Sequence, residues 1–282
     1  MAASPDRLGP DAIPAIAELC ARSLRDPPSL AELTDALTDP DQPATVRGDP
    51  ATGVVATVTS GDQGFVRLLV VAPEHRRRGI GRDLLAAAEA DLRAAGATSV
   101  TVGADPPGYL WPGVDVREIG LLCLLERAKY DRGEASCNLD LDLAGIPDDP
   151  GGWRRVAGGD ADTIRRVGEW SAEHWPWWRA ELVKAARRGT LVLTADGPPE
   201  RRDIEAVCAF DVTRRGLLGP VAVRPELMGR GRGVAALLGA LHVLRAEGRT
   251  AVEVSWVGPL VPYVRVGATM GRLFFVYRKQ LA

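Results

Sequence analysis

The sequence has few of the residues from which metal sites and histidine-based catalysis are built. Of its 282 residues, four are cysteine and three are histidine. The cysteines, Cys20, Cys123, Cys137 and Cys208, lie far apart, without a CxxC pair and without a histidine cluster beside them. Because a zinc site needs closely spaced Cys and His ligands, we expect no bound metal. Cys123 and Cys208 lie inside apolar runs, which predicts small core residues.

Long apolar runs and a basic leader segment are also missing. No stretch approaches the ~18–20 apolar residues that cross a bilayer, and no basic region followed by an apolar one opens the chain. These absences predict a cytoplasmic protein with no membrane partner. Basic residues number 35 against 37 acidic ones, a net charge of -2. This balance argues against a nucleic-acid partner, which would require a basic face.

What the sequence does contain is an internal repeat. The segment VRLLVVAPEHRRRGIGRDLLAAAEADLRAAGATSVTV resembles LGPVAVRPELMGRGRGVAALLGALHVLRAEGRTAVEV. Pro73 and Pro225 lie 152 positions apart, as do Gly79 and Gly231, and the alignment needs no gap. Chance could place a few glycines at matching positions. It does not produce the same succession of strand, loop, helix and strand in two segments that align without a gap, so the repeat indicates a duplication.

The duplication predicts two domains, residues 1–145 and 151–282. The residues between them, within the sequence IPDDPGG, are rich in turn formers and suit a linker. In each copy a buried strand, a loop, an amphipathic helix and a β-branched strand follow one another, which indicates an α/β fold. The predicted strands are 53–59, 66–72, 100–102, 190–195, 204–212, 218–223 and 252–254, and helices are expected at 11–24 and 160–188 and after each loop.

A loop rich in glycine and arginine joins strand to helix in each copy. Free backbone N–H groups and the positive end of the helix dipole meet there. Glycine lets a ligand approach the backbone, and arginine pairs with phosphate oxygens. A tight turn needs glycine without any ligand, but two copies in one context favour a pyrophosphate site. The candidate residues are Arg76, Arg77, Arg78, Gly79, Ile80, Gly81 and Arg82, and Met228, Gly229, Arg230, Gly231, Arg232 and Gly233.

The first loop matches a known motif. It lacks the GK[ST] ending of a P-loop and the Rossmann GxGxxG pattern. The run Arg76-x-x-Gly79-x-Gly81 instead resembles the R/Q-x-x-G-x-G/A motif of the GCN5-related N-acetyltransferase (GNAT) superfamily. That resemblance implies a site for acetyl-CoA, which would serve as acyl-donor substrate.

The second loop matches less cleanly, because Met228 takes the first motif position in the ungapped alignment. A shifted match, Arg230-x-x-Gly233-x-Ala235, costs a two-residue gap and ranks second. Taken together, the two halves resemble a tandem GNAT protein. The resemblance implies an α/β fold with two tandem GNAT-like domains, each a mixed, splayed β-sheet flanked by helices.

The resemblance also extends to a motif near the end of the family's sequences, which implies a catalytic tyrosine in the second half. Members often place a tyrosine four residues before Gly-Ala, where it protonates the departing CoA thiolate. Tyr263 stands four residues before Gly267, whereas the first half has Leu125 and Lys129 at these positions. Without the resemblance, Tyr263 would be an ordinary packed helix residue. We therefore expect a catalytic second domain and a degenerate first domain, although the first has the cleaner loop.

Donors for the oxyanion and a base for the amine complete the expected site. The resemblance implies backbone contacts to the donor from Val221, Ala222 and Val223, with Val71 as first-half counterpart. Glu253 is the candidate base, although carboxylates so placed are more often structural. An acceptor that arrives deprotonated would need no base.

Two further segments carry hypotheses about the acceptor. Residues 170–178 hold four tryptophans and predict either a bulky apolar or aromatic acceptor or, slightly favoured, a hydrophobic lid or a contact between domains. The turn-rich insertion 106–113 has no counterpart in the second half. We expect it to pack against the other domain or to shape a site there.

These observations predict an acyltransferase that moves an acetyl group from acetyl-CoA to a primary amine of a small molecule or peptide by direct attack. A hydroxyl acceptor or another acyl-CoA donor is an open alternative. A non-catalytic acyl-CoA sensor is a second alternative, which Met228 and Leu125 favour. No feature of the sequence sets the oligomeric state or whether the first domain binds CoA.

Overall fold

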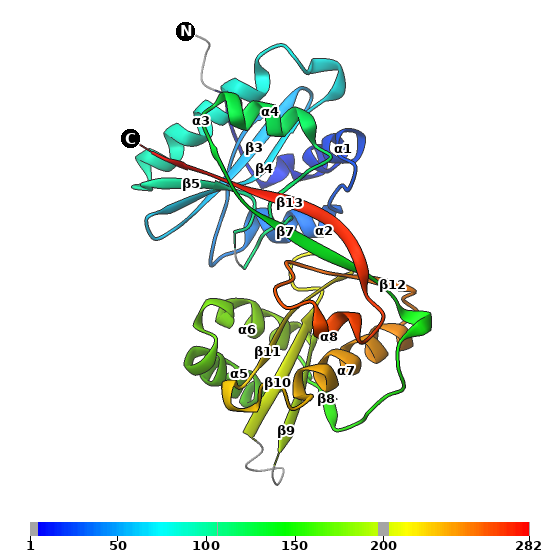
Figure 1. The fold of residues 1–282 in the computed structure, drawn as a ribbon. Helices are drawn as coiled ribbons and strands as arrows, with labels where there is room; N and C mark the ends of the chain where they lie inside the picture. The colour runs from blue at the N-terminus through cyan, green and yellow to red at the C-terminus, as the bar shows by residue number, and fades with distance from the viewer. Residues whose placement is uncertain (1–4, 106, 197–202, 282) are drawn as a thin grey trace. The chain divides into compact units, whose positions relative to one another are not determined.

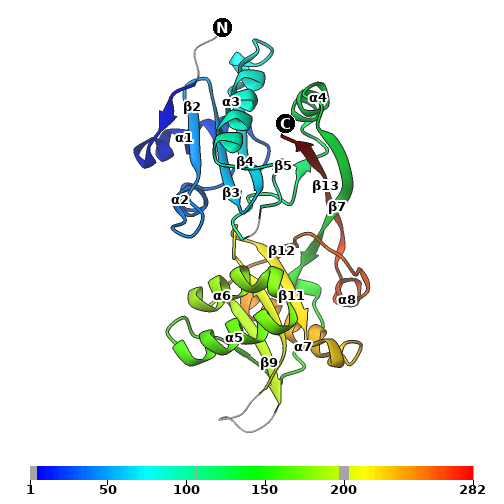
Figure 2. The same cartoon turned by 90° about the vertical axis from the view of Figure 1, so that its left-hand side faces the viewer.

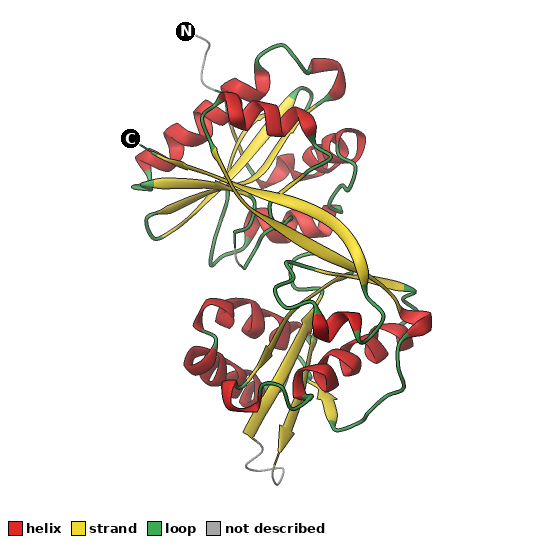
Figure 3. Ribbon diagram, in the orientation of Figure 1, coloured by secondary structure: helices red, strands yellow, loops and turns green. Residues whose placement is uncertain are grey.

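The chain folds into two compact units of strands and helices (Figure 1). The computed structural model describes residues 5–105, 107–196 and 203–281. The first unit comprises Met1–Ser136 with Leu273–Ala282, and the second comprises Cys137–Arg272. Within each unit, strands form a central layer with helices on both sides (Figure 3).

A mixed sheet forms the middle of the first unit, in the order β1–β2–β3–β4–β5–β13. Neighbouring strands are antiparallel except β4 and β5, which are parallel. The short β6 pairs with β13. The strands are β1 (Arg7–Leu8), β2 (Thr45–Asp49), β3 (Gly53–Ser60), β4 (Gln63–Val71), β5 (Ser99–Val102), β6 (Val114–Asp115) and β13 (Thr269–Gln280).

Helices cover both faces of this sheet (Figure 2). Two of them pack with Leu68 and Val70 of β4 on one face, and the other two pack with Val66 and Val100 on the opposite face. Val66 and Leu68 would share a face by strand alternation, but a bulge adds one residue, Arg67, between them and so turns them to opposite faces. The first pair is α1 (Ile13–Ser23) and α2 (Leu30–Thr38), and the second is α3 (Ile80–Ala94) and α4 (Ile119–Arg127).

The second unit repeats this design. Its sheet has the order β8–β9–β10–β11–β12–β7, with β11 and β12 as the parallel pair. Helices α5 and α6 share one cluster with Val207 and Ala222, while α7 shares the opposite cluster with Cys208 and Leu218. The strands are β7 (Asp131–Asp142), β8 (Trp153–Arg155), β9 (Leu191–Asp196), β10 (Asp203–Phe210), β11 (Leu217–Val223) and β12 (Ala251–Val254). The helices are α5 (Ala161–His174), α6 (Arg179–Arg188), α7 (Arg232–Ala246) and α8 (Val261–Val264).

The repeat seen in the sequence holds in three dimensions. Helices α3 and α7 begin 152 positions apart, and so do β5 and β12. Gly79 and Gly231 cap the two helices with φ of 90° and 79°, a left-handed conformation that suits glycine. The ungapped alignment is therefore the structural one, and the predicted α/β fold with mixed, splayed sheets is confirmed.

The boundaries of the units differ from the predicted domains 1–145 and 151–282 because two strands change places. Residues 277–280 of β13, at the chain's end, pair with β5 in the first unit. Residues 139–142 of β7 pair with β12 in the second unit. A single cut in the sequence therefore assigns the end of β13 to the second domain and the end of β7 to the first, the reverse of the units to which they belong.

Three local predictions differ from the structure. The predicted helix 160–188 is two helices, because a 3-10 turn at Pro176–Trp178 interrupts it. Helix α2 was absent from the prediction. Cys123 is exposed rather than in a core, since the apolar α4 buries only its Leu125 side. Cys208 is buried, as predicted.

Candidate active site

Each sheet opens where its parallel strands part. The pairing of β4 with β5 reaches Val66 and Val102 and then stops, although β4 continues to Val71. In the second unit, β11 and β12 pair only through Leu217 and Leu218, although β11 continues to Val223. Val66 and Leu218 are repeat equivalents, so both units leave the same stretch of one strand edge open.

The open edge of the second unit exposes the backbone of two predicted residues. Arg224 donates its N–H to Glu205 on β10, and alternate residues of a strand point to opposite edges. The N–H and C=O groups of Val221 and Val223 therefore face the gap, whereas those of Ala222 face β10. The indole of Trp175 donates to the Val223 carbonyl at 3.0 Å.

Val71 holds the equivalent place in the first unit. Its carbonyl accepts a hydrogen bond from Arg76 Nε at 3.1 Å, and Arg76 Nη2 also donates to Ser23. The Arg76 side chain is thus bound to the end of β4. Its guanidinium therefore lies against the last carbonyl of the open edge, rather than projecting from the loop as the sequence pattern predicts.

The first loop is a concave row of backbone donors. Within the described residues, the N–H groups of residues 77–82 donate to no other group. Arg77 and Gly79 have positive φ of 64° and 90°, which turns successive N–H groups to one side and makes an anion-binding nest. Arg77 and Arg78 are exposed there, while Arg82 pairs with Asp83.

Tight packing holds the first turn of α3 below this loop. Ile80 packs against the α3 and α4 core, and a Cβ on Gly81 would lie 3.3 Å from Leu124 and 3.7 Å from Val71. The turn thus sits close to the end of β4. The nest therefore adjoins the end of the open strand edge.

The second loop repeats the nest with fewer charges. Gly229 and Gly231 have φ of 77° and 79°, in the places of Arg77 and Gly79. Met228 and Arg230 are exposed. A Cβ on Gly233 would meet Val223 at 2.7 Å, so glycine is required for the helix to approach β11.

Arg232, the first residue of α7, has a carboxylate partner. Its Nε lies 3.3 Å from Glu205 Oε2, and Glu205 is buried beneath it. The pair neutralises one of the positive charges beside the second loop. The first loop has no such acid, because glycine (Gly53) takes the place of Glu205.

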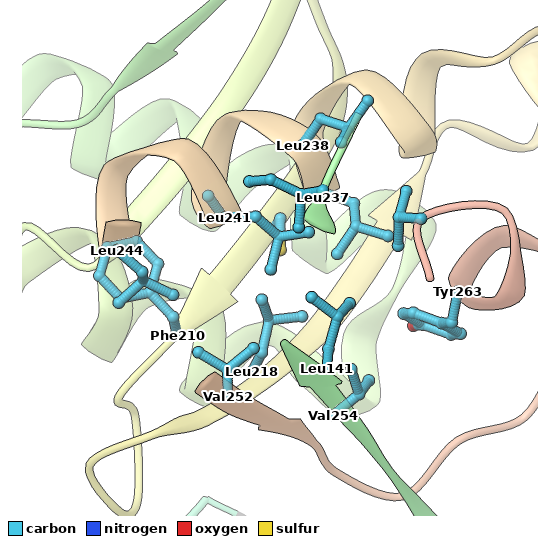
Figure 4. Close-up of a cluster of buried hydrophobic side chains, with 14 of the residues drawn as sticks. Leu141, Phe210, Leu218, Leu237, Leu238, Leu241, Leu244, Val252, Val254 and Tyr263 are labelled. Atoms are coloured by element: carbon cyan, nitrogen blue, oxygen red, sulfur yellow. The ribbon is translucent and has the colours of Figure 1, made fainter. Parts of the chain in front are cut away.

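Tyr263 lies on α8 against the α7 side of the second sheet. Its side chain is 8% exposed and belongs to the cluster with Leu218, Val254 and Leu237, where Figure 4 shows its ring beside Val254 and Leu141. Burial, with a smaller effect from Cys208, raises the pKa of Tyr263 above its ordinary value. The phenol is therefore protonated at neutral pH and is able to donate a proton.

Leu125 stands where the first unit would need that tyrosine. Tyr130 donates its N–H to the Leu125 carbonyl at 3.0 Å, as Ala268 does to Tyr263. Leu125 is fully buried in the α3 and α4 cluster. The first unit thus has an apolar side chain in place of the hydroxyl.

Glu253, the predicted base, is held by two donors. Arg272 donates Nε and Nη2 to its carboxylate at 2.7 and 2.6 Å, and Asn138 Nδ2 donates at 2.9 Å. The contact with Asn138 on β7 joins β12 to its neighbouring strand. This geometry favours a role for Glu253 in fixing strands over a role in proton transfer.

The α1 and α2 face of the first unit is filled beside the open edge. Arg67 is the extra residue of a β-bulge between β3 and β4, at the position equivalent to Gly219. Its fully buried guanidinium pairs with Asp105 and also donates to Ala36 and Gln42. Arg67 and its partners therefore occupy this face beside the bulge.

The insertion 106–113 closes the same face. Leu110 and Trp111 pack in the cluster of α1 and α2, and a Cβ on Gly108 would lie 2.7 Å from Arg67 Nη2. These contacts of the insertion lie within the first unit. Pro106 lies outside the described residues.

The equivalent face of the second unit carries an acid that the sequence analysis missed. Glu181, in the first turn of α6, is only 4% exposed, and within the described residues no hydrogen bond or ion pair reaches its carboxylate. Burial raises the pKa of Glu181 to about 7, against a smaller opposing effect of Lys184. Its position on the apolar stripe with Leu182 and Ala185 was the available signal.

Two classes of feature are missing from the parts of the chain that the structure describes. No group of three or more His, Cys, Asp or Glu side chains is placed to hold a metal ion there. No described helix has the length and apolar character to cross a membrane.

The layers, the open parallel pair and the glycine loop define an α/β protein built from two halves of one type. Residues 16–108 match the model of the Acetyltransferase (GNAT) family. The resemblance to the GNAT superfamily is therefore confirmed, and the chain carries a GNAT-family segment within a tandem GNAT fold. No curated protein matches the sequence.

Solved structures share this fold over nearly the whole chain. A GCN5-related N-acetyltransferase from Sphaerobacter thermophilus is 20% identical with a TM-score of 0.70, covering 98% of this chain and 94% of that one. A tandem GNAT protein from the clavulanic acid biosynthesis pathway is 18% identical with a TM-score of 0.69, covering 98% of both chains.

A fungal protein shares the fold as part of a longer chain. It is the GCN5-related glucosamine N-acetyltransferase region of a multi-domain GH3 β-N-acetylglucosaminidase. The two are 19% identical with a TM-score of 0.78, over 97% of this chain. This chain spans only 38% of the fungal one.

The buried ion pair in the first unit predicts a stability difference. Asp105→Ala leaves the Arg67 guanidinium buried without a counter-charge, which should cost about 3–5 kcal/mol of unfolding free energy. Asp91→Ala, which removes the half-exposed partner of Arg47, should cost about 1 kcal/mol or less. Urea unfolding at pH 7, with hydrogen exchange of β4 amides assigning the transition, measures both. Equal losses would contradict the assignment.

The paired loops predict two separable binding events for CoA. Arg78 and Arg230 are repeat equivalents and are both exposed. Replacing either with alanine should weaken CoA binding at its own loop about tenfold, or about 1.4 kcal/mol. Calorimetric titration of each variant measures this, with Arg165→Ala on α5 as control. A variant that leaves every binding event unchanged excludes its loop as a CoA site.

Proposed function

We propose that the protein transfers an acetyl group from acetyl-CoA to a primary amine of a small molecule or peptide, and that the second unit carries the chemistry. The GNAT fold binds acetyl-CoA as a substrate, and family members transfer its acetyl group to amines. The observation that carries the proposal is the combination, in one unit, of an open strand edge, a donor nest and the protonated Tyr263.

The donor would lie along residues that fit its chemistry. The N–H groups of Gly229, Gly231 and Gly233, with the Arg230 guanidinium, would hold the pyrophosphate. The backbone groups of Val221 and Val223 would pair with the amides of the pantetheine arm, as a neighbouring strand does. A Val221 or Val223 N–H would also stabilise the oxyanion as the thioester carbonyl becomes tetrahedral.

The reaction would then be a direct displacement. The amine nitrogen bonds to the thioester carbon, the C–S bond breaks, and the sulfur takes the proton of the Tyr263 hydroxyl. Burial keeps that proton in place at neutral pH, because it disfavours the phenolate. No covalent enzyme intermediate is needed.

The first unit is proposed to bind CoA without catalysis. Its nest and open edge are intact, with the exposed Arg77 and Arg78 beside them. Leu125 supplies no proton, and Arg67 fills the face from which an acceptor would approach. This combination favours a regulatory or structural acyl-CoA site there.

One structurally similar protein supports a broad class of acceptor, the amines that include amino sugars. The fungal region is described as a glucosamine N-acetyltransferase. Amino sugars are therefore among the amines to be screened, beside polyamines, amino acids and peptide N-termini. Release of free CoA thiol reports turnover for each of them.

Tyr263→Phe tests the proposal. The variant keeps the ring in its cluster but removes the proton donor, so kcat should fall about 10²-fold or more while the Kd for CoA stays unchanged. Tyr277→Phe, which removes a buried hydroxyl of the first unit, should leave kcat unaltered. An unimpaired Tyr263→Phe enzyme would assign the proton to another group. Absence of acetyl-CoA binding in calorimetry would exclude the function.

A further inference from the structure

Among the described residues, the α5 and α6 face of the second unit holds two polar side chains without a hydrogen-bond partner, and the carboxylate of the buried Glu181 is one of them. The other is the indole N–H of Trp170 on α5, which is buried with no hydrogen-bond acceptor. Trp170 shares its cluster with Leu182, the neighbour of Glu181. Buried polar groups are normally hydrogen-bonded, so an unpaired donor and an unpaired acceptor in adjoining helices point to a ligand that pairs with them.

The turn between α5 and α6 brings this place to the end of β11. The contact of Trp175 with the Val223 carbonyl attaches the turn to the strand edge that faces the gap. Glu181 follows Trp175 by six residues, in the first turn of α6. The acid therefore lies just beyond the anchored turn, on the same face of the sheet as Ala222.

Tryptophan rings form the wall of this turn, which we name the tryptophan corner: Trp175, Trp177 and Trp178. The rings of Trp175 and Trp178 are stacked, with centroids 5.1 Å apart, and Trp177 meets both edge-on. Trp177 is 62% exposed, so a flat ring surface is open to solvent. Aromatic faces of this kind attract cations and the apolar faces of rings.

Tyr263 and Glu181 lie on opposite faces of one sheet. Tyr263 belongs to the cluster of α7, and the neighbours of Glu181 belong to the cluster of α5 and α6. Beyond Leu218 the edge of β11 has no neighbouring strand. An acyl donor bound along that edge would have the face of Tyr263 on one side and the face of Glu181 on the other.

We propose that the tryptophan corner is the acceptor subsite, that Glu181 takes the proton released by the attacking amine, and that the preferred acceptors are primary amines carried on a ring with an apolar face. This inference rests on the proposed function and deepens it. The ring is either aromatic or the C–H face of a sugar, because both stack on tryptophan.

The proton transfers balance. The ammonium of the acceptor first gives one proton to the Glu181 carboxylate, and the free amine forms the N–C bond. The tetrahedral nitrogen loses its second proton to solvent as the C–S bond breaks, and the sulfur takes the Tyr263 proton. Glu181 then releases its proton to solvent, and Tyr263 regains one.

The pH profile tests Glu181. With a pKa of about 7, the unprotonated acid is lost below that pH, so kcat/KM should fall tenfold per pH unit below about 7. Glu181→Gln should lower kcat/KM at pH 7.5 about 10²-fold or more and abolish the break, with the Kd for CoA unchanged.

Neighbouring charged groups are controlled separately. Lys184 lies on the same helix, His174 on α5 stands edge-on to Trp170, and Glu205 on β10 is paired with Arg232. His174→Gln should keep the break near pH 7. If Glu181→Gln keeps both rate and break, the role of Glu181 is overturned.

Stability distinguishes this role from a structural one. The folded-state pKa of Glu181 is raised above its ordinary value of 4.5, so the charged form costs stability, and that cost grows as pH rises towards 7 and remains above it. Glu181→Gln should therefore raise the urea midpoint, and more at pH 8 than at pH 5.5. A structural carboxylate would instead lower the midpoint when replaced. Rising stability with falling activity supports the proposal.

A comparison of three amines tests the tryptophan corner. We expect kcat/KM for 2-phenylethylamine or for glucosamine to exceed that for putrescine at least tenfold. Whichever of these two amines has the higher kcat/KM shows whether the preferred ring is aromatic or a sugar. Trp177→Ala should erase the preference, whereas Ile119→Ala, an exposed apolar change in the first unit, should keep it.

Two failures have different meanings. Thiol release with putrescine but not with either ring-bearing amine overturns the inference and leaves the proposed function standing. No thiol release with any amine, together with no binding of acetyl-CoA, overturns both.

Discussion

The early end of the parallel pairing between β11 and β12 is the constraint on which the site depends. After Leu218, the edge of β11 has no neighbouring strand, although backbone groups inside a sheet are normally paired. The Trp175 indole satisfies the Val223 carbonyl from the side. The remaining groups of that edge stay open for a ligand shaped like a strand. The loop and the start of α7 continue this edge as a nest, in which the N–H groups of Gly229, Gly231 and Gly233 have no partner among the described residues.

The duplication shows how one scaffold diverges by few side chains. The nests and open edges of both units agree in residue spacing, because they depend on backbone conformation and glycine. The faces around them differ through side chains at equivalent places: Arg67 for Gly219, and Leu125 for Tyr263. A buried guanidinium needs a counter-charge and hydrogen-bond acceptors. Arg67 has them, because Asp105, Ala36 and Gln42 accept hydrogen bonds from its side chain. Such a filled face supports an assignment of chemistry to the second unit.

Local signals in the sequence predict the elements whose contacts are local. The helices after each loop, their glycine caps and the strands before them follow from periodicity, and the fixed spacing of 152 supplies the alignment. The exchange of β7 and β13 does not follow, because residues 277–280 find their partners near residue 100, and no short-range pattern encodes that pairing. The roles of Arg76 and Glu253 were also out of reach, since their partners Ser23 and Arg272 are set only by the fold.

Burial sets the protonation states of Tyr263 and Glu181, the two candidate catalytic groups of the second unit. Tyr263 is kept neutral by its apolar cluster, and Glu181 has a pKa near neutrality because no partner compensates for its burial. Burial thus favours the neutral form of both groups. Glu253, by contrast, accepts hydrogen bonds from Arg272 and Asn138 and is held in place by these contacts. Among the acidic side chains near the gap, the lack of a partner is therefore what separates a candidate for chemistry from a structural residue.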